Sequence, residues 1–324
     1  MNKYIDIINF NDAKNIIIEN DLNTDDLTDY TVGLYVNNKL VGTGSLYKNI
    51  IKLVAIKKAY QKENLLSLII TKLITELTLR GYDKYFLYTK ESEAKYFISL
   101  GFKEIVSAKG ISFLENSLNP ITTVLSDIAG GLDLNDKSVG AVVVNCNPPT
   151  LGHIYLITEA AKKHDKLLVF LVSEDRSFFP YEKRKKMLSE AIKDLKNVYL
   201  LPSTNYLISS STFPTYFLKD LSKKSEIEMA LDVKIFTSYF MPIFNISKRY
   251  VGSEEKDAFT NAYNNTLKAS LGDKLVIYER FKINDVIVSG SLVREYYKAG
   301  KLKEIKSLVP EATYKELLKW EIVF

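Results

Sequence analysis

The chain has 324 residues, 46% of them hydrophobic and 26% charged, a composition typical of a folded soluble protein with room for two domains. Its 44 basic and 39 acidic residues give a formal net charge of +5 without a basic block, which argues against a nucleic-acid partner. The single cysteine, the N-terminus without a signal-like pattern and the short apolar runs predict a cytoplasmic protein without disulfides or membrane spans.

Residues 1–118 are predicted to form a first α/β domain. The stretch "TVGLYVNNKLVGTGSLYKNIIKLVAI" predicts three strands, and Asn37 and Asn38 suit the first hairpin turn because asparagine tolerates positive φ. Apolar residues at helical spacing predict a helix that ends at Gly81. A strand "YFLYT", a helix that ends at Gly101 and a strand "ISFLE" complete the expected alternation.

Residues 119–138 are predicted to be a linker, because they combine a proline, a Gly-Gly pair and several turn-forming Asn and Asp residues. Residues 139–324 then alternate short apolar strands with amphipathic helices. This alternation predicts a parallel sheet with right-handed crossovers, a Rossmann-like α/β domain.

The turn "NCNPPTLGH" follows the first strand of this second domain and precedes a helix. Ligands of parallel sheets bind at the carboxyl ends of the strands, and a helix N-terminus favours an anion there. Gly152 would let a phosphate approach the backbone, while Thr150 and His153 would lie on the same side of the first helical turn. We therefore predict a phosphate site in this turn, to which Asn145, Asn147 and Pro148 also belong.

A second motif, "VSGSLVREYY", lies late in the chain at the start of a predicted helix. Ser289 and Ser291 can cap that helix and donate to phosphate oxygens, and Arg294 offers a charged fork for the β- and γ-phosphates. The alternative reading is an ordinary helix cap followed by a surface arginine.

The two motifs resemble the T/H-x-G-H and I-S-x-S-x-V-R motifs of the nucleotidyltransferase superfamily. Together with "EDRSFFPYEKRKKML", "YLISSSTFPTYFLK" and "RYVGSEEKDAFTNAYN", they resemble the citrate lyase ligase family over most of residues 140–310. The resemblance implies that Arg184 also faces ATP. Gly252 and Glu254 follow a predicted strand and are expected at the ATP site, where Glu254 could face the nucleotide or Mg²⁺. For Arg184, a solvated basic helix face is the other reading, and residues 211–214 ("STFP") receive no role.

This resemblance implies an enzyme, an acid–thiol ligase, that activates acetate with ATP to acetyl-AMP, releasing pyrophosphate. It would then acetylate the prosthetic-group thiol of the acyl carrier subunit of citrate lyase, releasing AMP. His153, Thr150 and Arg294 would be the catalytic residues. The alternative is a nucleotidyltransferase that adenylylates a phosphate-bearing metabolite, such as a pantetheine or nicotinamide nucleotide.

Two histidines and one cysteine are too few for a usual zinc site, so we expect no resident transition metal. Mg²⁺ that enters with ATP is expected, with unassigned ligands, since it needs only one or two carboxylates besides phosphate oxygens. Cys146 lacks an identifiable base and is expected to be buried and inert. His164, in the polar stretch "KKHDK", is expected to be exposed to solvent at the end of a helix.

The first domain resembles the acetyltransferase-like domain that this family carries, most clearly in "AKYFISLGFKEI". Acetyltransferases bind the pyrophosphate of acetyl-CoA with a glycine-rich loop, whereas the corresponding stretch here, "QKENLL", has no glycine. The side chains would obstruct close backbone approach, so we expect no standard acetyl-CoA binding. Docking of a partner's prosthetic arm and a purely structural role both stay open.

Overall fold

The computed structural model describes residues 2–61, 64–173, 177–207, 216, 218, 223–253 and 258–320, except the side chains of 258 and 259. The chain forms two compact units, each with its own β-sheet. The first comprises Met1–Val124 and Ile208–Lys234, and the second comprises Leu125–Leu207 and Ile235–Phe324.

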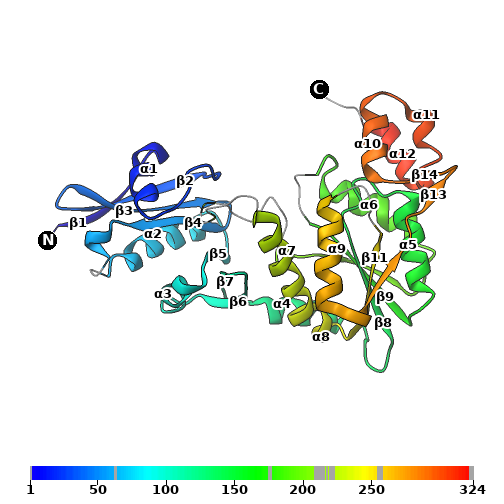
Figure 1. Ribbon diagram of the computed structural model, residues 1–324, viewed down its shortest axis with the longest axis horizontal. Coiled ribbons are helices and arrows are strands. Elements are labelled where there is room, and N and C mark those ends of the chain that lie inside the picture. Colours follow the sequence, from blue (N-terminus) through cyan, green and yellow to red (C-terminus); the bar gives the residue numbers. More distant parts are fainter. Residues whose placement is uncertain are drawn as a thin grey trace. The chain divides into compact units, whose positions relative to one another are not determined.

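The sheet of the first unit has seven strands in the order β1-β2-β3-β4-β5-β7-β6. All neighbours pair antiparallel except β4 and β5, which are parallel. Helix α2 packs its apolar face on β2, β3 and β4 (Figure 1). The elements are β1 (Lys3–Ile7), α1 (Phe10–Glu19), β2 (Tyr30–Val36), β3 (Lys39–Tyr47), β4 (Ile50–Ile56), α2 (Leu66–Leu79), β5 (Lys84–Lys90), α3 (Ala94–Ile98), β6 (Lys103–Ala108) and β7 (Ile111–Ser117).

The turn residues of this unit adopt the backbone conformation that the sequence predicts. Asn37 and Asn38 have φ values of 48° and 62° in the β2–β3 hairpin. Gly81 and Gly101 follow the ends of α2 and α3 with φ values of 83° and 93°. The left-handed conformation is least costly for glycine and asparagine. The hairpin turn and the ends of the two helices therefore lie where these residues predict them.

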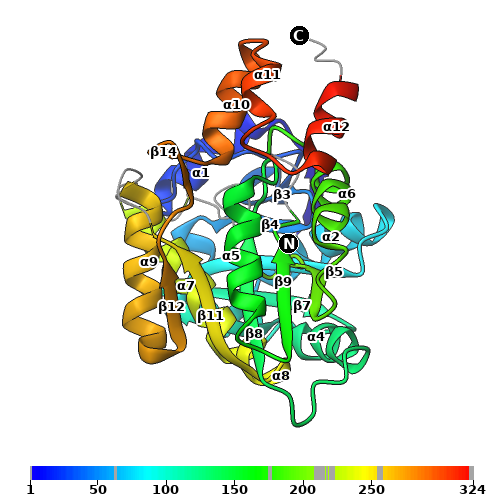
Figure 2. The ribbon, with the colours of Figure 1, turned by 90° about the vertical axis from the view of Figure 1, so that its right-hand side faces the viewer.

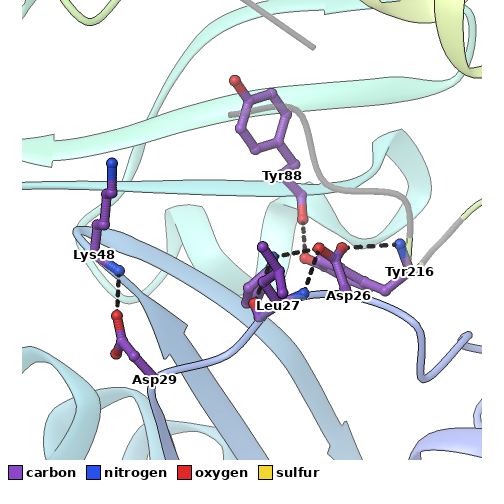
Figure 3. Close-up of polar contacts among 7 residues, drawn as sticks. Asp26, Leu27, Asp29, Lys48, Tyr88 and Tyr216 are labelled. Carbon is purple, nitrogen blue, oxygen red and sulfur yellow. Dashed lines mark hydrogen bonds and ion pairs between the residues drawn. The ribbon is translucent and has the colours of Figure 1, made fainter. Parts of the chain in front are cut away.

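Strands β4 and β5 pair only at Ile50 and Ile51 and then separate. The phenol of Tyr216 bridges the two strands: its hydroxyl donates to the Tyr88 carbonyl of β5 at 2.7 Å and accepts from the Leu53 main chain of β4. The Tyr216 main-chain N–H donates to the Asp26 carboxylate (Figure 3). The other oxygen of this carboxylate pairs with the Lys52 ammonium at 2.6 Å. A residue from the chain segment between β10 and α7 therefore completes the core of the first unit.

The sheet of the second unit has five parallel strands in the order β10-β9-β8-β11-β12, which confirms the predicted α/β class. Helix α5 lies on the face that is turned toward the viewer in Figure 2. The elements are β8 (Val139–Val144), α5 (Leu151–Ala161), β9 (Lys166–Leu171), α6 (Tyr181–Ile192), β10 (Val198–Pro202), a π-helical turn (Phe236–Phe240), α8 (Met241–Ile243), β11 (Ile246–Gly252), α9 (Ala258–Leu271), β12 (Leu275–Tyr278), β13 (Lys282–Ile283), β14 (Val286–Ile287), α10 (Gly290–Lys298), α11 (Leu302–Ile305) and α12 (Glu311–Lys319).

Both faces of this sheet are covered, as the continuous apolar strands require. On one face, Ile157 of α5 and Leu188 of α6 pack against Val142 and Val169. On the other face, the Phe170 ring packs edge-on against the Phe240 ring of the π-helical turn and the Phe244 ring directly after α8. Because helices cover both faces, a ligand can reach this sheet only at its edges. In parallel α/β sheets the binding site lies at the carboxyl ends of the strands.

Two segments differ from the expected organisation. The stretch 119–138, predicted as a linker, contains helix α4 (Ile121–Gly130), and the division between the units falls within that helix. Residues Ile208–Lys234, which contain most of helix α7 (Lys224–Ile235), group with the first unit, although they lie within the predicted second domain. Contacts such as the Lys109–Glu226 ion pair join α7 to the first unit, and they link residues too distant in sequence for local patterns to show.

Candidate active site

A cavity of about 430 Å³ lies at the carboxyl ends of β8, β11 and β12. Its wall is formed by the turn after β8, the end of β11, helix α9, residues 278–281 and residues 288–294. Nine of the predicted site residues line it: Asn145, Asn147, Thr150, Gly152, His153, Gly252, Ser289, Ser291 and Arg294. The structure thus brings the two sequence motifs together around one space.

Thr150 and His153 form a tight pair at the start of α5. The Thr150 main-chain N–H donates to His153 Nδ1 at 3.1 Å, and the Thr150 hydroxyl lies 2.8 Å from the same nitrogen. Because a main-chain N–H can only donate, Nδ1 must be unprotonated and the ring proton must be on Nε2. The pair therefore fixes the tautomer of the imidazole.

The environment keeps His153 neutral at physiological pH. Burial, and then the nearby Arg280 guanidinium, lower the pKa of His153 to about 4. A neutral imidazole with Nε2–H is a hydrogen-bond donor rather than a cation or a base. What His153 can offer a phosphate is therefore one oriented N–H, next to the main-chain N–H groups of the helix N-terminus.

The second motif meets the turn directly. Ser289 caps α10 by accepting from the Leu292 N–H at 3.2 Å, as predicted. Arg294 Nη1 donates to the Asn147 carbonyl at 2.5 Å, and its Nη2 donates to the Ser291 hydroxyl at 3.0 Å. Burial lowers the pKa of Arg294, which still carries its charge at neutral pH. The alternative of an ordinary surface arginine does not fit these contacts.

Gly152 is explained by protein packing. A Cβ built on Gly152 would lie 2.8 Å from the Val288 carbonyl oxygen, closer than side chains tolerate. The glycine thus lets the segment before α10 approach α5. Access for a phosphate at Gly152 stays a prediction.

The structure corrects one of the two predictions for Arg184. It is fully buried on α6, so the solvated basic face is wrong, and it is not among the described residues that line the cavity. Nε donates to the Phe179 carbonyl at 2.9 Å, while Nη1 donates to the carbonyls of Asn145 and Val172 at 2.7 and 2.9 Å. Arg184 therefore holds the turn in place from beneath.

Pro148, Glu254 and residues 211–214 were also singled out in the sequence. Pro148 is buried and does not line the cavity. Glu254 and residues 211–214 lie outside the described residues. The position of Glu254 at the nucleotide stays a prediction.

Cys146 is an inert side chain. It is completely buried in the core between the sheet and α5, and burial raises the pKa of its thiol. Although Cys146 is among the residues that line the cavity, a buried thiol that stays protonated is a poor nucleophile. Burial thus agrees with the inert role expected from the sequence.

The expected exposure of His164 is wrong. Its Nδ1 lies 2.6 Å from the Ser138 hydroxyl and its Nε2 lies 2.8 Å from the Tyr250 hydroxyl. A Cβ on Gly140 would overlap its ring. His164 is thus a half-buried packing residue near the amino end of β8, and the distant glycine that makes room for it could not be recognised from local sequence.

Several cavity residues were not recognised from the sequence. Arg280 follows β12, and its Nε donates to the Ser253 carbonyl at 2.8 Å. Tyr263 and Asn264 come from α9, and Arg249 lies within β11. The rule that ligands bind after parallel strands could have pointed to Arg280, but nothing local distinguishes Arg249 from the neighbouring Lys248.

The first unit holds a separate cavity of about 560 Å³ where β4 and β5 separate. Gln61 and Leu66, the ends of the stretch without glycines, contribute to its wall, as does Tyr216. Lys62 and Glu63 lie outside the described residues.

No group of three His, Cys, Asp or Glu side chains in the described ranges is arranged to hold a metal ion. None of the helices in the described part of the chain is long and apolar enough to cross a membrane.

Comparison with known sequences gives a consistent result. Residues 139–317 match the family described as the citrate lyase ligase C-terminal domain. The chain is 35% identical to the citrate (pro-3S)-lyase ligase of Klebsiella pneumoniae over 87% of this chain and 84% of that protein. It is 33% identical to the enzyme of the same name from Escherichia coli, over 91% and 86% of the two chains.

More distant similarities cover parts of the chain. A phosphopantetheine adenylyltransferase from Streptococcus gordonii is 30% identical over 32% of this chain and 65% of its own length. Among solved structures, a GCN5-related N-acetyltransferase from Rhodopseudomonas palustris covers 36% of this chain and 97% of its own, with 15% identity and a TM-score of 0.30. The ribosomal-protein-S18-alanine N-acetyltransferase of Escherichia coli covers 37% and 97%, with 18% identity and a TM-score of 0.30.

Proposed function

Because the chain belongs to the citrate lyase ligase family, we propose that it activates acetate with ATP and acetylates the prosthetic-group thiol of the acyl carrier subunit of citrate lyase. Acetylation of this thiol activates citrate lyase. The observation that carries the proposal is the meeting of Thr150, His153 and Arg294 at one cavity, within the matched region. No enzyme nucleophile is needed, which agrees with the buried Cys146.

In the first step, a carboxylate oxygen of acetate attacks the α-phosphorus of ATP in line. An O–P bond forms, the bond to the β-phosphate oxygen breaks, and acetyl-AMP and pyrophosphate result. Such chemistry depends on positioning and on neutralisation of charge. The N-terminus of α5 and the His153 Nε2–H group suit the α-phosphate, and the Arg294 guanidinium suits the leaving pyrophosphate.

In the second step, the carrier thiol attacks the acetyl carbonyl, the C–S bond forms and the C–O bond to AMP breaks. His153 is poorly suited to take the thiol proton, because Nδ1 accepts from Thr150 and Nε2 already carries a proton. The departing AMP phosphate or water is then the acceptor. We thus expect His153 to matter mainly for the first step.

Mg²⁺ bound with ATP would supply further neutralisation of phosphate charge. Glu279 is the one carboxylate among the described residues of the cavity wall. This donor set fits a cation that is held mainly by phosphate oxygens and water, rather than by a protein cage.

The test is exchange of labelled pyrophosphate into ATP. We expect exchange that requires acetate, together with AMP formation that is completed only by deacetylated carrier subunit. Exchange that ignores acetate but requires a phosphorylated metabolite would support the adenylyltransferase alternative and contradict the proposal.

At the residue level, His153→Ala should lower the exchange rate by about 100- to 1,000-fold, the usual effect of removing one donor to a developing charge. Circular dichroism and thermal unfolding should show that the fold is kept. Full exchange activity in this variant would show that the turn does not carry the chemistry.

A further inference from the structure

Arg249 is a buried cation with no counter-ion among the described residues. It lies within β11 and is 1% exposed. Nη2 donates to the Tyr263 hydroxyl at 2.8 Å, but Nε and Nη1 are buried without a hydrogen-bond partner, and no ion pair of Arg249 occurs among the described residues. Its guanidinium carbon lies 4.1 Å from the centre of the Phe236 ring.

Such an arrangement costs stability, since burial of an unpaired charge loses hydration that one phenol and one ring face do not replace. A buried guanidinium with unused donors is expected where an anion arrives later. Arg249 also forms part of the cavity wall, so its donors adjoin the space in which the ATP chemistry is proposed.

The depth of Arg249 in the sheet indicates that its guanidinium binds a small anion and not the triphosphate. In the sheet, Arg249 pairs with Ala141, three residues before the end of β8. At a rise of about 3.3 Å per residue, this puts its backbone roughly 10 Å below the edge from which the phosphate-binding turn and α5 start. The triphosphate has Arg294 and the α5 N-terminus at that edge, so the deeper cation is available to another anion.

We propose that Arg249 binds the carboxylate of the acyl substrate and presents one of its oxygens to the α-phosphorus. This inference rests on the proposed function, in which a short carboxylate is the one anion besides ATP that must enter the cavity before chemistry. The aromatic rings of Phe236 and Tyr263 contact the Arg249 guanidinium, so its orientation is fixed before the carboxylate binds.

The experiment compares Arg249→Met and Arg249→Lys with wild type in acetate-dependent pyrophosphate exchange. In Arg249→Met the KM for acetate should rise by about 10- to 100-fold, the effect of a lost charge-assisted hydrogen bond. The KM for ATP should stay within about twofold, and Arg249→Lys should recover part of the loss. Lys248→Met, which removes a half-exposed charge next along the strand, should leave both constants unchanged.

Thermal unfolding separates binding from structure. If Arg249 is kept for its ligand, Arg249→Met should unfold at the same temperature as wild type or higher, since it removes an unpaired buried charge. In wild type, but not in this variant, acetate should raise the unfolding temperature of the complex with a non-hydrolysable ATP analogue. If Arg249→Met fails to fold, Arg249→Lys carries both measurements.

The outcomes are distinct. An unchanged KM for acetate, or a rise confined to the KM for ATP, overturns the assignment of Arg249 while the proposed function stands. A lower unfolding temperature with both constants unchanged assigns it a structural role. A wild-type enzyme whose exchange does not require acetate overturns the proposed function itself.

Discussion

At the scale of single residues, the candidate site works through groups whose protonation is set by their surroundings. Burial keeps the Cys146 thiol protonated and the His153 imidazole neutral. Arg249, Arg280 and Arg294 supply positive charge at the same cavity. The most conspicuous residues of the turn are thus a packing side chain and a neutral donor.

The two histidines allow a direct test by NMR titration. We expect a midpoint of about 4 for His153 and a midpoint below the usual 6.5 for His164, because burial lowers the pKa of both. His164→Gln identifies the signals by removing one of them. A His153 midpoint near 6.5 would contradict the fixed neutral tautomer.

The same pKa shift makes stability depend on pH. The unfolded His153 takes up a proton near pH 6.5, whereas the folded residue does so only near pH 4. Between these values the unfolded state binds more protons, so the contribution of His153 to stability falls as the pH drops from about 6.5 to about 4. His153→Gln should flatten this part of the pH profile of chemical unfolding.

At the scale of elements, the site depends on how α5 meets the segment before α10. Gly152 and Gly290 are both needed for this approach, since a Cβ on Gly290 would lie 3.0 Å from the Asn147 carbonyl oxygen. Arg184 fixes the same turn from α6. The phosphate site is therefore a junction of three elements rather than a property of one loop.

Two glycine variants distinguish packing from ligand contact. Gly152→Ala should lower both the stability, by about 1–3 kcal/mol, and ATP affinity, since its Cβ meets the Val288 backbone. Gly252→Ala has open space around its Cβ, so it should keep the unfolding temperature but weaken ATP binding if the nucleotide lies there. Gly130→Ala, equally open but outside the cavity wall, is the control.

Calorimetry and thermal unfolding check both variants. Normal ATP binding by Gly252→Ala would remove Gly252 from the nucleotide site. An unfolding temperature for Gly152→Ala equal to that of the control would contradict the packing argument.

At the scale of the whole molecule, the two units are not two consecutive stretches of chain. Residues Ile208–Lys234 belong to the first unit, although the residues before and after them belong to the second. Within the first unit, Tyr216 bridges β4 and β5. The first unit is therefore completed by residues that lie far along the chain.

This crossing predicts that the first unit is not independent of the later segment. A fragment of residues 1–138, which lacks Tyr216, should unfold at a lower temperature than the first unit of the full chain, because Tyr216, 6% exposed in the full chain, bridges β4 and β5 there. The single tryptophan, Trp320, packs against Phe179, so its fluorescence identifies the transition of the second unit in the full chain, and circular dichroism follows the first unit. The same transition in fragment and full chain would show that the crossing segment contributes nothing to the stability of the first unit.

Local patterns in the sequence determined much of this protein. Strand and helix periodicity predicted the parallel sheet, asparagine and glycine predicted the turns, and two motifs predicted part of the cavity wall, because each of these depends on residues close together in the chain. Tertiary structure alone decided the rest. The burial of Arg184 and His164, the insertion of Tyr216 and the unpaired charge of Arg249 arise from contacts between distant segments, and burial, which sets the energy of a charge, is a property of those contacts.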